Sequence, residues 1–388
     1  MSVTTARNTL VLAEFFLPQI GGSINWLIHT YSRYPKGTAV VVAPQCADPD
    51  MTDGDLPFPV KRLPCPMLPW IPIAPASWPE YYSAFRWMKT VCTQYEIQQI
   101  HCAKVLPEGL FAMVLGYFRS VPYLIYAHGE EVQICQTSKA LSWLMPKVYN
   151  GASAIIANST NTKEILEKAG VQKEKIHIIH PGVNVQDYVG QEARELEIRK
   201  RHKLDGPVLL TVGRLQRRKG QDMVIKALSE VKKIFPSIYY LIVGGGEEEA
   251  SLQNLAYECG VADHVVFAGK IPDAELSAYY AACDVFVMPN RQIGEDIEGF
   301  GMVYLEAGAA GKPVIGGTSG GTRDAIVDGV TGFRVNGENL CDLQDAIVKC
   351  LGDPQKAKGL GKNGRQRVFR EFTWDQVYSK TQKLSSVL

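Results

Sequence analysis

The chain repeats short apolar runs, each followed by a turn and a segment of helical periodicity. Such a run next to a turn predicts a buried strand, and the alternation of strands with helices predicts an α/β fold. The first run, residues 9–15, leads into Gly21 and Gly22, and helical periodicity begins at Ile24. Further strands are expected at residues 38–43, 97–102, 121–127, 154–157, 176–179, 207–212, 239–243, 264–267, 284–289, 314–315 and 333–335.

The alternation is interrupted by a charged stretch that is poor in large apolar residues. Residues 186–204 have this character and predict a helical surface connector between two domains. A chain of 388 residues is also too long for one ordinary core. We therefore expect a first domain at residues 1–185 and a second at residues 186–371.

The composition narrows the function classes. The formal net charge is +1, so no global field attracts nucleic acid or an anionic membrane. The nine cysteines form no C-x-x-C pair and no metal-spaced cluster with histidine, which is typical of a reduced, cytosolic protein. No apolar run approaches the roughly 20 residues of a membrane span. Glu14 interrupts the first apolar run, which argues against a signal peptide. We expect a cytoplasmic protein.

The densest chemistry lies in residues 298–313. Gly299 and Gly301 follow the carboxylate of Glu298 and precede a helix. The glycines let a ligand approach the backbone, and the N–H groups at a helix start favour a phosphate. Glu306, more than one turn into the helix, can accept hydrogen bonds from a vicinal diol such as a ribose, and Glu298 can do so for a second polyol. These features predict binding of a nucleotide sugar, a diphosphate with a sugar at each end.

A basic glycine turn after the strand at residues 207–212 is a second phosphate-binding feature. Arg214 offers a planar guanidinium fork and Lys219 a point charge, and both suit a diphosphate. Arg217 and Arg218 lie between them, and we expect these two side chains to be solvated.

With these motifs the chain resembles the retaining family 4 glycosyltransferases, whose signature is an E-x7-E arrangement around Gly-Phe-Gly. The resemblance covers essentially the whole chain and is densest at residues 213–335. It implies the GT-B fold, with two Rossmann-like, doubly wound α/β domains that face each other across a cleft. The C-terminal helix, at residues 372–388, is expected to pack back on the first domain.

The family activity that this resemblance implies is transfer of a hexose from a nucleoside-diphosphate sugar to a hydroxyl acceptor. The anomeric configuration is retained, and protein cations in place of a metal stabilise the leaving phosphate. We therefore expect no cofactor, and the first domain is expected to bind the acceptor while the second binds the nucleotide sugar.

The resemblance also assigns roles to individual residues. His128 stands at a strand end in the family pattern His-Gly-x-Glu, and it joins Arg214, Lys219 and Glu298 as the expected catalytic group. In the family, Glu298 holds donor-sugar hydroxyls and is not a nucleophile. The expected donor-binding positions are Gly21, Gly22, Lys270, Ile271, Gly299, Phe300, Gly301, Met302, Val303 and Glu306. Lys270 and Ile271 border the nucleobase through their main chain.

Two Asp-x-Asp patterns occur in the N-terminal half, at residues 48–50 and 53–55. Such motifs bind metal in glycosyltransferases of another fold. Here they lie in a Pro/Gly-rich stretch, where aspartate is typical of turns. We therefore expect turns and no metal site.

Residues 67–88 are rich in proline and aromatic residues, namely Trp70, Trp78, Tyr81, Tyr82, Phe85 and Trp87. Aromatic side chains with polar tips are favoured at interfaces and at the depth of lipid headgroups. Packing beneath a long loop explains the same composition. Basic residues are sparse here, with Arg86 in this stretch and Lys89 just after it, so attraction to anionic lipid would be weak. Core packing, acceptor binding and weak contact with the inner face of the membrane remain open.

Two alternative functions use the same donor site. A nucleotide-sugar 2-epimerase of GT-B fold would act on the donor without an acceptor, and a non-catalytic binding protein would only sense it. Retention of Arg214, Lys219, Glu298 and Glu306 argues against the second alternative. The sequence does not select between a saccharide, a lipid-linked saccharide and a polyol as acceptor. It also leaves open the donor hexose, UDP or GDP as its nucleotide, and the oligomeric state.

Overall fold

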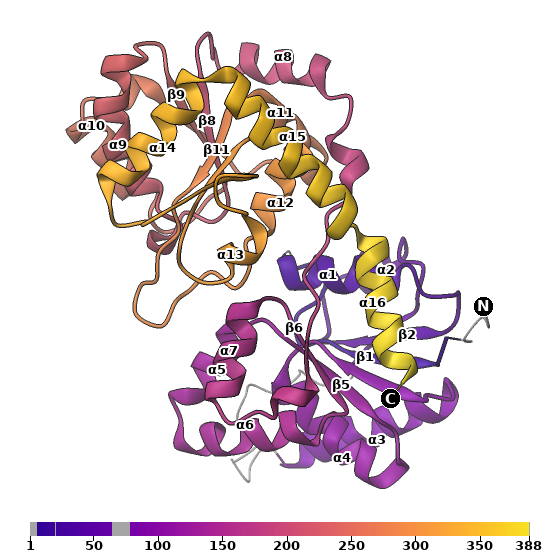
Figure 1. The fold of residues 1–388 in the computed structure, drawn as a ribbon. Helices are drawn as coiled ribbons and strands as arrows, with labels where there is room; N and C mark the ends of the chain where they lie inside the picture. The colour runs from indigo at the N-terminus through magenta and orange to yellow at the C-terminus, as the bar shows by residue number, and fades with distance from the viewer. Residues whose placement is uncertain (1–5, 20, 64–77, 388) are drawn as a thin grey trace. The chain divides into compact units, whose positions relative to one another are not determined.

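The computed structural model describes residues 6–19, 21–63 and 78–387, which form two compact units (Figure 1). The first unit contains the described residues up to Pro181 together with those from Trp374 onward, and the second runs from Gly182 to Thr373. Each unit has a parallel sheet and an apolar core of its own, so the predicted α/β class with two Rossmann-like domains is confirmed. The sequence placed the corresponding boundaries at residues 185/186 and 371/372.

The first unit is built on seven parallel strands in the order β3-β2-β1-β4-β5-β6-β7. Their bounds are β1 (Thr9–Leu12), β2 (Ala39–Ala43), β3 (Val60–Arg62), β4 (Gln99–Cys102), β5 (Tyr123–Ala127), β6 (Ala154–Ala157) and β7 (Ile176–Ile178). Every residue of β1, β2, β4, β5 and β6 is buried, which explains why these strands appear in the sequence as short, mostly apolar runs.

The strand order of this sheet reverses at its centre. β1 pairs with β2 on one side and with β4 on the other, so the chain builds the sheet outward in both directions from β1. In open parallel sheets, ligands bind beyond the carboxyl ends of the strands at such a reversal. Residues that follow β1 and β4 are therefore placed where a ligand is expected.

Helices connect these strands. Their bounds are α1 (Gly22–Tyr31), α2 (Pro49–Asp53), α3 (Trp78–Gln94), α4 (Leu110–Arg119), α5 (Glu130–Gln136), α6 (Lys139–Gly151), α7 (Thr160–Lys168) and α16 (Trp374–Ser386). A short turn, Val105–Gly109, joins β4 to α4. Ser159 caps α7 by accepting a hydrogen bond from the Thr162 amide.

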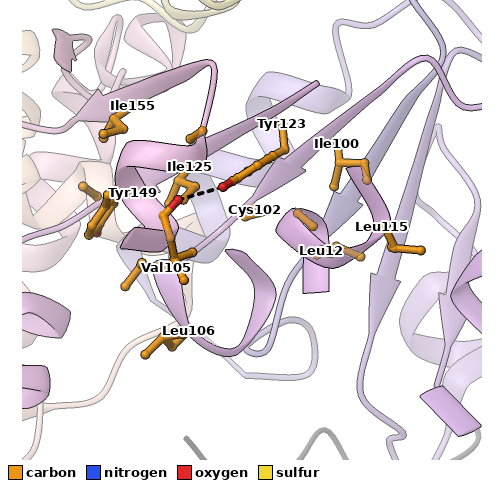
Figure 2. Close-up of a cluster of buried hydrophobic side chains, with 14 of the residues drawn as sticks. Leu12, Ile100, Cys102, Val105, Leu106, Leu115, Tyr123, Ile125, Tyr149 and Ile155 are labelled. Carbon is orange, nitrogen blue, oxygen red and sulfur yellow. Dashed lines mark hydrogen bonds between the residues drawn. The ribbon is translucent and has the colours of Figure 1, made fainter. Parts of the chain in front are cut away.

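The core of the first unit lies between this sheet and its helices. Figure 2 shows part of it, with Leu12, Ile100 and Cys102 from the central strands and Leu115 from α4. The Tyr123 hydroxyl donates a 2.8 Å hydrogen bond to the main-chain carbonyl of Val148, so this buried polar group is satisfied.

The C-terminal helix α16 is held to the rest of the first unit by buried polar and aromatic contacts. The two ring nitrogens of His101 lie 2.6 Å from the Tyr31 hydroxyl and 3.2 Å from the Ser385 hydroxyl. His29 stacks on Trp374 with 4.8 Å between ring centroids. Burial lowers the pKa of His101 to about 3, so this histidine is neutral at physiological pH. These contacts give His101 a structural role.

The second unit has six parallel strands in the order β10-β9-β8-β11-β12-β13. Their bounds are β8 (Val208–Val212), β9 (Tyr239–Val243), β10 (Val265–Gly269), β11 (Val285–Met288), β12 (Val314–Gly317) and β13 (Gly332–Val335). The helices are α8 (Glu192–Arg201), α9 (Gln221–Ile234), α10 (Glu249–Glu258), α11 (Asp273–Ala282), α12 (Met302–Ala309), α13 (Thr322–Ala325), α14 (Leu340–Gly352) and α15 (Pro354–Glu371). Here the order reverses between β8 and β11, so the loops that follow these two strands meet at one edge.

Two segments differ from their predicted structure. Residues 49–53, expected as a turn, form the short helix α2, which begins at a proline, a residue well suited to the first helical position. Asp53 in this helix makes a paired contact with the Arg62 guanidinium at 2.6 and 2.9 Å. The aromatic stretch 78–88 belongs to helix α3, where Phe85 and Trp87 pack against the core. The part of this aromatic stretch at residues 67–77, which includes Trp70, lies outside the described residues.

No helix in the described part of the chain combines the length and the apolar character needed to cross a membrane. Within the same described ranges, no group of three or more His, Cys, Asp or Glu side chains is arranged to hold a metal ion.

Candidate active site

The loop between β11 and α12 carries the Glu298 motif, and its backbone depends on glycine. Gly301 has φ +88°, and a Cβ at this position would lie 2.5 Å from the Tyr304 ring. Gly320 packs against this loop so closely that a Cβ would lie 2.1 Å from the Glu298 carbonyl oxygen. The glycines therefore let the chain turn sharply into α12 and fix where Glu298 lies.

Glu298 is buried and makes two ion pairs. Its Oε2 accepts hydrogen bonds from Lys219 Nζ at 2.6 Å and from Arg218 Nη1 at 2.5 Å. Arg218 Nε also lies 2.9 Å from Oδ1 of Asp296, which belongs to the same loop as Glu298. The expectation that Arg218 would be solvated is therefore wrong, because the guanidinium is buried against two carboxylates. Arg217 is exposed, as expected.

The electrostatics of this cluster favour an ionised Glu298. Burial alone would raise the pKa of Glu298, but the charges of Lys219 and Arg218 and their hydrogen bonds lower it to about 2. Burial lowers the pKa of Lys219, and the Glu298 carboxylate opposes that shift. The carboxylate therefore holds both a buried lysine and a buried arginine in place beside the glycine turn.

Arg214 lies in the same strand-end loop as Lys219. Its side chain is exposed, and its carbonyl accepts a 3.1 Å hydrogen bond from Gln221 at the start of α9. The charge of Arg214 is close enough to affect the pKa of Lys219. The structure thus brings together Arg214, Lys219 and Glu298, three of the residues that the sequence predicts as a group.

Glu306 lies on α12 and is held by a tyrosine from α11. The Tyr280 hydroxyl donates a 2.5 Å hydrogen bond to Glu306 Oε2, and the Tyr188 ring packs edge-on against Tyr280 with 5.7 Å between centroids. Burial raises the pKa of Glu306, an effect strengthened by Asp273 and opposed by the Tyr280 hydrogen bond. Tyr280 fixes one carboxylate oxygen and so orients the second.

Lys270 and Ile271 follow β10 at the same edge of the sheet as the turns after β8 and β9. A Cβ at Gly245 would lie 3.3 Å from Lys270 Cε, so the lysine stem covers this turn. A Cβ at Gly246 would lie 2.4 Å from the Leu215 carbonyl oxygen, so only glycine lets these two loops approach. Lys270 is exposed and Ile271 is half-buried.

In the first unit, His128 follows β5 and is held from several sides. Its amide donates to Glu131 Oε1 at 2.7 Å, and its carbonyl accepts from Asn158 Nδ2 at 3.1 Å. Nε2 lies 3.2 Å from the Ala103 carbonyl, which can only accept, so Nε2 carries the proton. Burial lowers the pKa of His128, so the ring is neutral near pH 7 and presents Nδ1 as an acceptor.

Gly21 directly precedes α1, which begins at Gly22. A Cβ at Gly21 would meet no atom within 4 Å, and its φ of 177° is an extended conformation open to any residue. The fold therefore does not itself require a glycine at position 21. The open space above its backbone suits the close approach of a ligand.

Two site residues were missed from the sequence. Arg218 stands in a charge run, which is usually solvated, and its two carboxylate partners are far away in sequence. Tyr280 stands in an apolar helical stretch with no polar pattern to mark it. Both contacts join segments separated by 26 or more positions, so no local signal could reveal them.

Comparisons with known proteins agree with this geometry. Residues 193–367 match the family model "Glycosyl transferases group 1", and residues 35–187 match "Glycosyltransferase Family 4". The chain is 33% identical over 296 residues to a GDP-mannose-dependent alpha-(1-6)-phosphatidylinositol monomannoside mannosyltransferase of Mycobacterium tuberculosis, covering 76% of this chain and 77% of the relative. It is 30% identical over 382 residues to the corresponding monoacylated-substrate enzyme of Corynebacterium glutamicum, covering 96% of each.

Solved structures support the fold. Anabaena Alr3699/HepE in complex with UDP superposes with a TM-score of 0.84 over 98% of this chain and 100% of its own, at 21% identity. The sucrose-phosphate synthase of Thermosynechococcus elongatus gives a TM-score of 0.78 over 98% of both chains, at 24% identity.

The buried pairing of Arg218 with Glu298 predicts a loss of stability when the arginine is removed. Arg218→Ala leaves Glu298 with one cation, and we expect the free energy of unfolding at pH 7 to fall by about 2 kcal/mol. The Glu298 pKa is lowered on folding from 4.5 to about 2, so this contribution is present above pH 4.5 and is lost as the pH falls towards 2.

Urea unfolding of Arg218→Ala at pH 7 and at pH 3 measures this effect. The matched control is Arg217→Ala, whose exposed side chain should change stability by less than about 0.5 kcal/mol. Equal losses for the two variants, or a loss for Arg218→Ala that does not shrink at pH 3, would contradict the assignment.

Proposed function

The chain belongs to the family 4 glycosyltransferases of GT-B fold and is a hexosyltransferase that uses a nucleotide sugar, and from this premise we propose that it transfers mannose from GDP-mannose to a lipid-linked polyol or saccharide. The observation that carries this proposal is the match to the Corynebacterium glutamicum relative over 96% of both chains. That relative is named as GDP-mannose-dependent and as acting on a phosphatidylinositol monomannoside. The intact cluster of Lys219 and Glu298 supports the same chemistry.

The departing diphosphate needs positive charge where its own negative charge develops. Arg214 is exposed at the glycine turn, and Lys219 is held beside it by Glu298. The N-terminus of α12, which follows Gly301, adds backbone N–H groups and the positive end of a helix dipole. Such preorganised donors stabilise a leaving group without waiting for solvent to reorient. We therefore propose that transfer proceeds without a metal ion.

The two glutamates of the motif suit the two sugars of the donor. Tyr280 occupies Oε2 of Glu306, so the other oxygen can accept from the ribose hydroxyls. Lys219 and Arg218 both contact Oε2 of Glu298, so its Oε1 is placed to accept from hydroxyls of the mannose. In this proposal, Lys270 and Ile271 border the base.

His128 is proposed to contact the transferred sugar. Its neutral ring presents an acceptor nitrogen, and its carbonyl is fixed by the Asn158 amide. A neutral acceptor here can bind a sugar hydroxyl without attracting a second anion. We propose that configuration is retained, with the leaving phosphate accepting the proton of the attacking hydroxyl on the same face of the sugar.

A lipid-linked acceptor calls for contact with a membrane, and α3 and α4 offer a surface for it. Tyr82 on α3 and Tyr117 and Phe118 on α4 have exposed fractions of 64%, 85% and 68%. The two helices pack together, and Phe85 contacts Phe118 edge-on at 6.1 Å. Arg86, Lys89 and Arg119 lie on the same two helices and add positive charge. Aromatic rings flanked by basic side chains favour the headgroup layer of an anionic membrane.

Donor binding tests the proposed function. We expect GDP-mannose at one hundred times its Kd to stabilise the protein by about 2.7 kcal/mol in excess EDTA, measured as a rise in Tm, and UDP-glucose at equal concentration to do less. Mannoside formation should also continue in EDTA. A larger Tm rise with UDP-glucose, activity restored only by Mn²⁺, or an epimerised nucleotide sugar as the sole product would each contradict the proposal.

Vesicle binding tests the surface on α3 and α4. Replacing Tyr117 and Phe118 together by serine removes two aromatic rings that would enter the headgroup layer. We expect this to weaken binding to vesicles of equal phosphatidylglycerol and phosphatidylcholine by at least about tenfold. The control is Tyr257→Ser, which removes an equally exposed tyrosine on α10. Co-sedimentation that is equal for both variants would contradict this surface.

A further inference from the structure

Three buried oxygen atoms without partners gather in the first unit. They are Glu14 Oε2, Tyr81 Oη and Glu108 Oε2, and none has a hydrogen-bond partner among the described residues. Glu108 is 1% exposed. An unsatisfied buried polar atom destabilises the fold, and few remain in native proteins without a functional reason. Within the described ranges, three such atoms at one place form a set of polar groups that the hydroxyls of a ligand would satisfy.

The three oxygens belong to one cluster. The Glu14 amide donates to Glu108 Oε1 at 2.8 Å, which joins the segment after β1 to the turn after β4. The charge of Glu14 also affects the pKa of both Glu108 and Tyr81, so all three groups are close in space. β1 and β4 are neighbours where the strand order reverses, the place where an open parallel sheet binds its ligand.

The charges around the cluster nearly balance. Lys104, which follows β4, is buried, and its Nζ lies 3.7 Å from Glu130 Oε1 and 4.4 Å from the centre of the Phe15 ring. Burial, with a further contribution from Glu14, raises the pKa of Glu108 to about 8, so this carboxyl is mostly protonated at pH 7. With the protonated Glu108 uncharged, one lysine faces the carboxyl groups of Glu14 and Glu130, so the site has no excess positive charge with which to select a phosphate.

The hydrogen-bonding capacity of the cluster fits neighbouring hydroxyls. A carboxylate accepts, a protonated carboxyl donates, and a tyrosine hydroxyl does both, while each hydroxyl of a ring polyol both donates and accepts. Phe15 is 38% exposed beside Glu14 and offers an apolar surface for the C–H groups of such a ring. Pockets for small ligands commonly combine an apolar surface with a few polar groups that fix orientation.

We propose that Glu14, Tyr81 and Glu108 form a subsite that binds the hydroxyls of a neutral ring polyol, either a sugar or a cyclitol, as part of the acceptor. The assignment to the acceptor rests on the proposed function, which places the nucleotide contacts mainly in the second unit. Lys104 connects this subsite to the catalytic position, because its charge acts on both Glu14 and His128. The hydroxyl that receives the sugar would therefore be presented from the carboxyl ends of β1, β4 and β5.

Direct binding of two small probes tests the subsite. Saturation-transfer NMR with methyl α-mannopyranoside and with myo-inositol reports binding without any turnover, and the stronger probe shows whether a sugar or a cyclitol is preferred. Glu14→Gln and Tyr81→Phe keep the size of each side chain, and we expect them to weaken the preferred probe by about tenfold and about threefold, respectively. Glu80→Gln is the control, because it removes an exposed carboxylate next to Tyr81.

The Tm rise with GDP-mannose should be unchanged in all three variants, which shows that the fold and the donor site are intact. Probe affinities that are equal in wild type and both subsite variants, or no binding of either probe to the wild type, would overturn the subsite. If the proposed function is wrong and the subsite is right, polyol binding will still depend on Glu14 and Tyr81, but the protein will not bind GDP-mannose.

Discussion

The candidate site in the second unit depends on one buried carboxylate that holds two cations. Glu298 would be expensive to bury alone, and so would Lys219 and Arg218. Together they neutralise one another at the carboxyl ends of β8 and β11, which are neighbours in the second sheet. The arrangement places a lysine beside the exposed guanidinium of Arg214, and it leaves one oxygen of Glu298 to accept from a ligand. In the proposed function, the positive charge for the diphosphate is thus positioned before the donor arrives.

Glycine makes this arrangement possible in the backbone. Gly301 allows the turn into α12, while Gly246 and Gly320 let strand-end loops approach where a side chain would collide with a carbonyl oxygen. The first unit uses the edge beyond its own central strands differently. There, a neutral His128 and an almost charge-balanced cluster around Glu108 replace the cations of the second unit. The two units therefore offer different chemistry, one suited to a diphosphate and the other to neutral hydroxyls.

The α/β class and most strands could be predicted from the sequence, because parallel strands buried on both faces appear as short apolar runs between glycine turns. The family resemblance implied the grouping of Arg214, Lys219 and Glu298, and each of the three follows a strand of the same sheet. Arg218 and Tyr280 could not. Their roles arise from contacts with Glu298 and Glu306 across 80 and 26 positions, and Arg218 stands in a charge run that usually faces solvent. The helix α2 was missed because Asp, Pro and Gly are shared by turns and helix starts.

The affinity for GDP in excess EDTA tests most directly whether this protein binds a diphosphate with side-chain cations held by Glu298. Isothermal titration calorimetry should compare the wild type with Lys219→Met and with the control Lys226→Met. Lys226 is an exposed lysine on α9. We expect Lys219→Met to weaken GDP binding by at least about tenfold, or about 1.4 kcal/mol, and Lys226→Met to bind GDP as the wild type does. Wild-type affinity in Lys219→Met, or GDP binding that appears only when a divalent metal is added, would contradict this expectation.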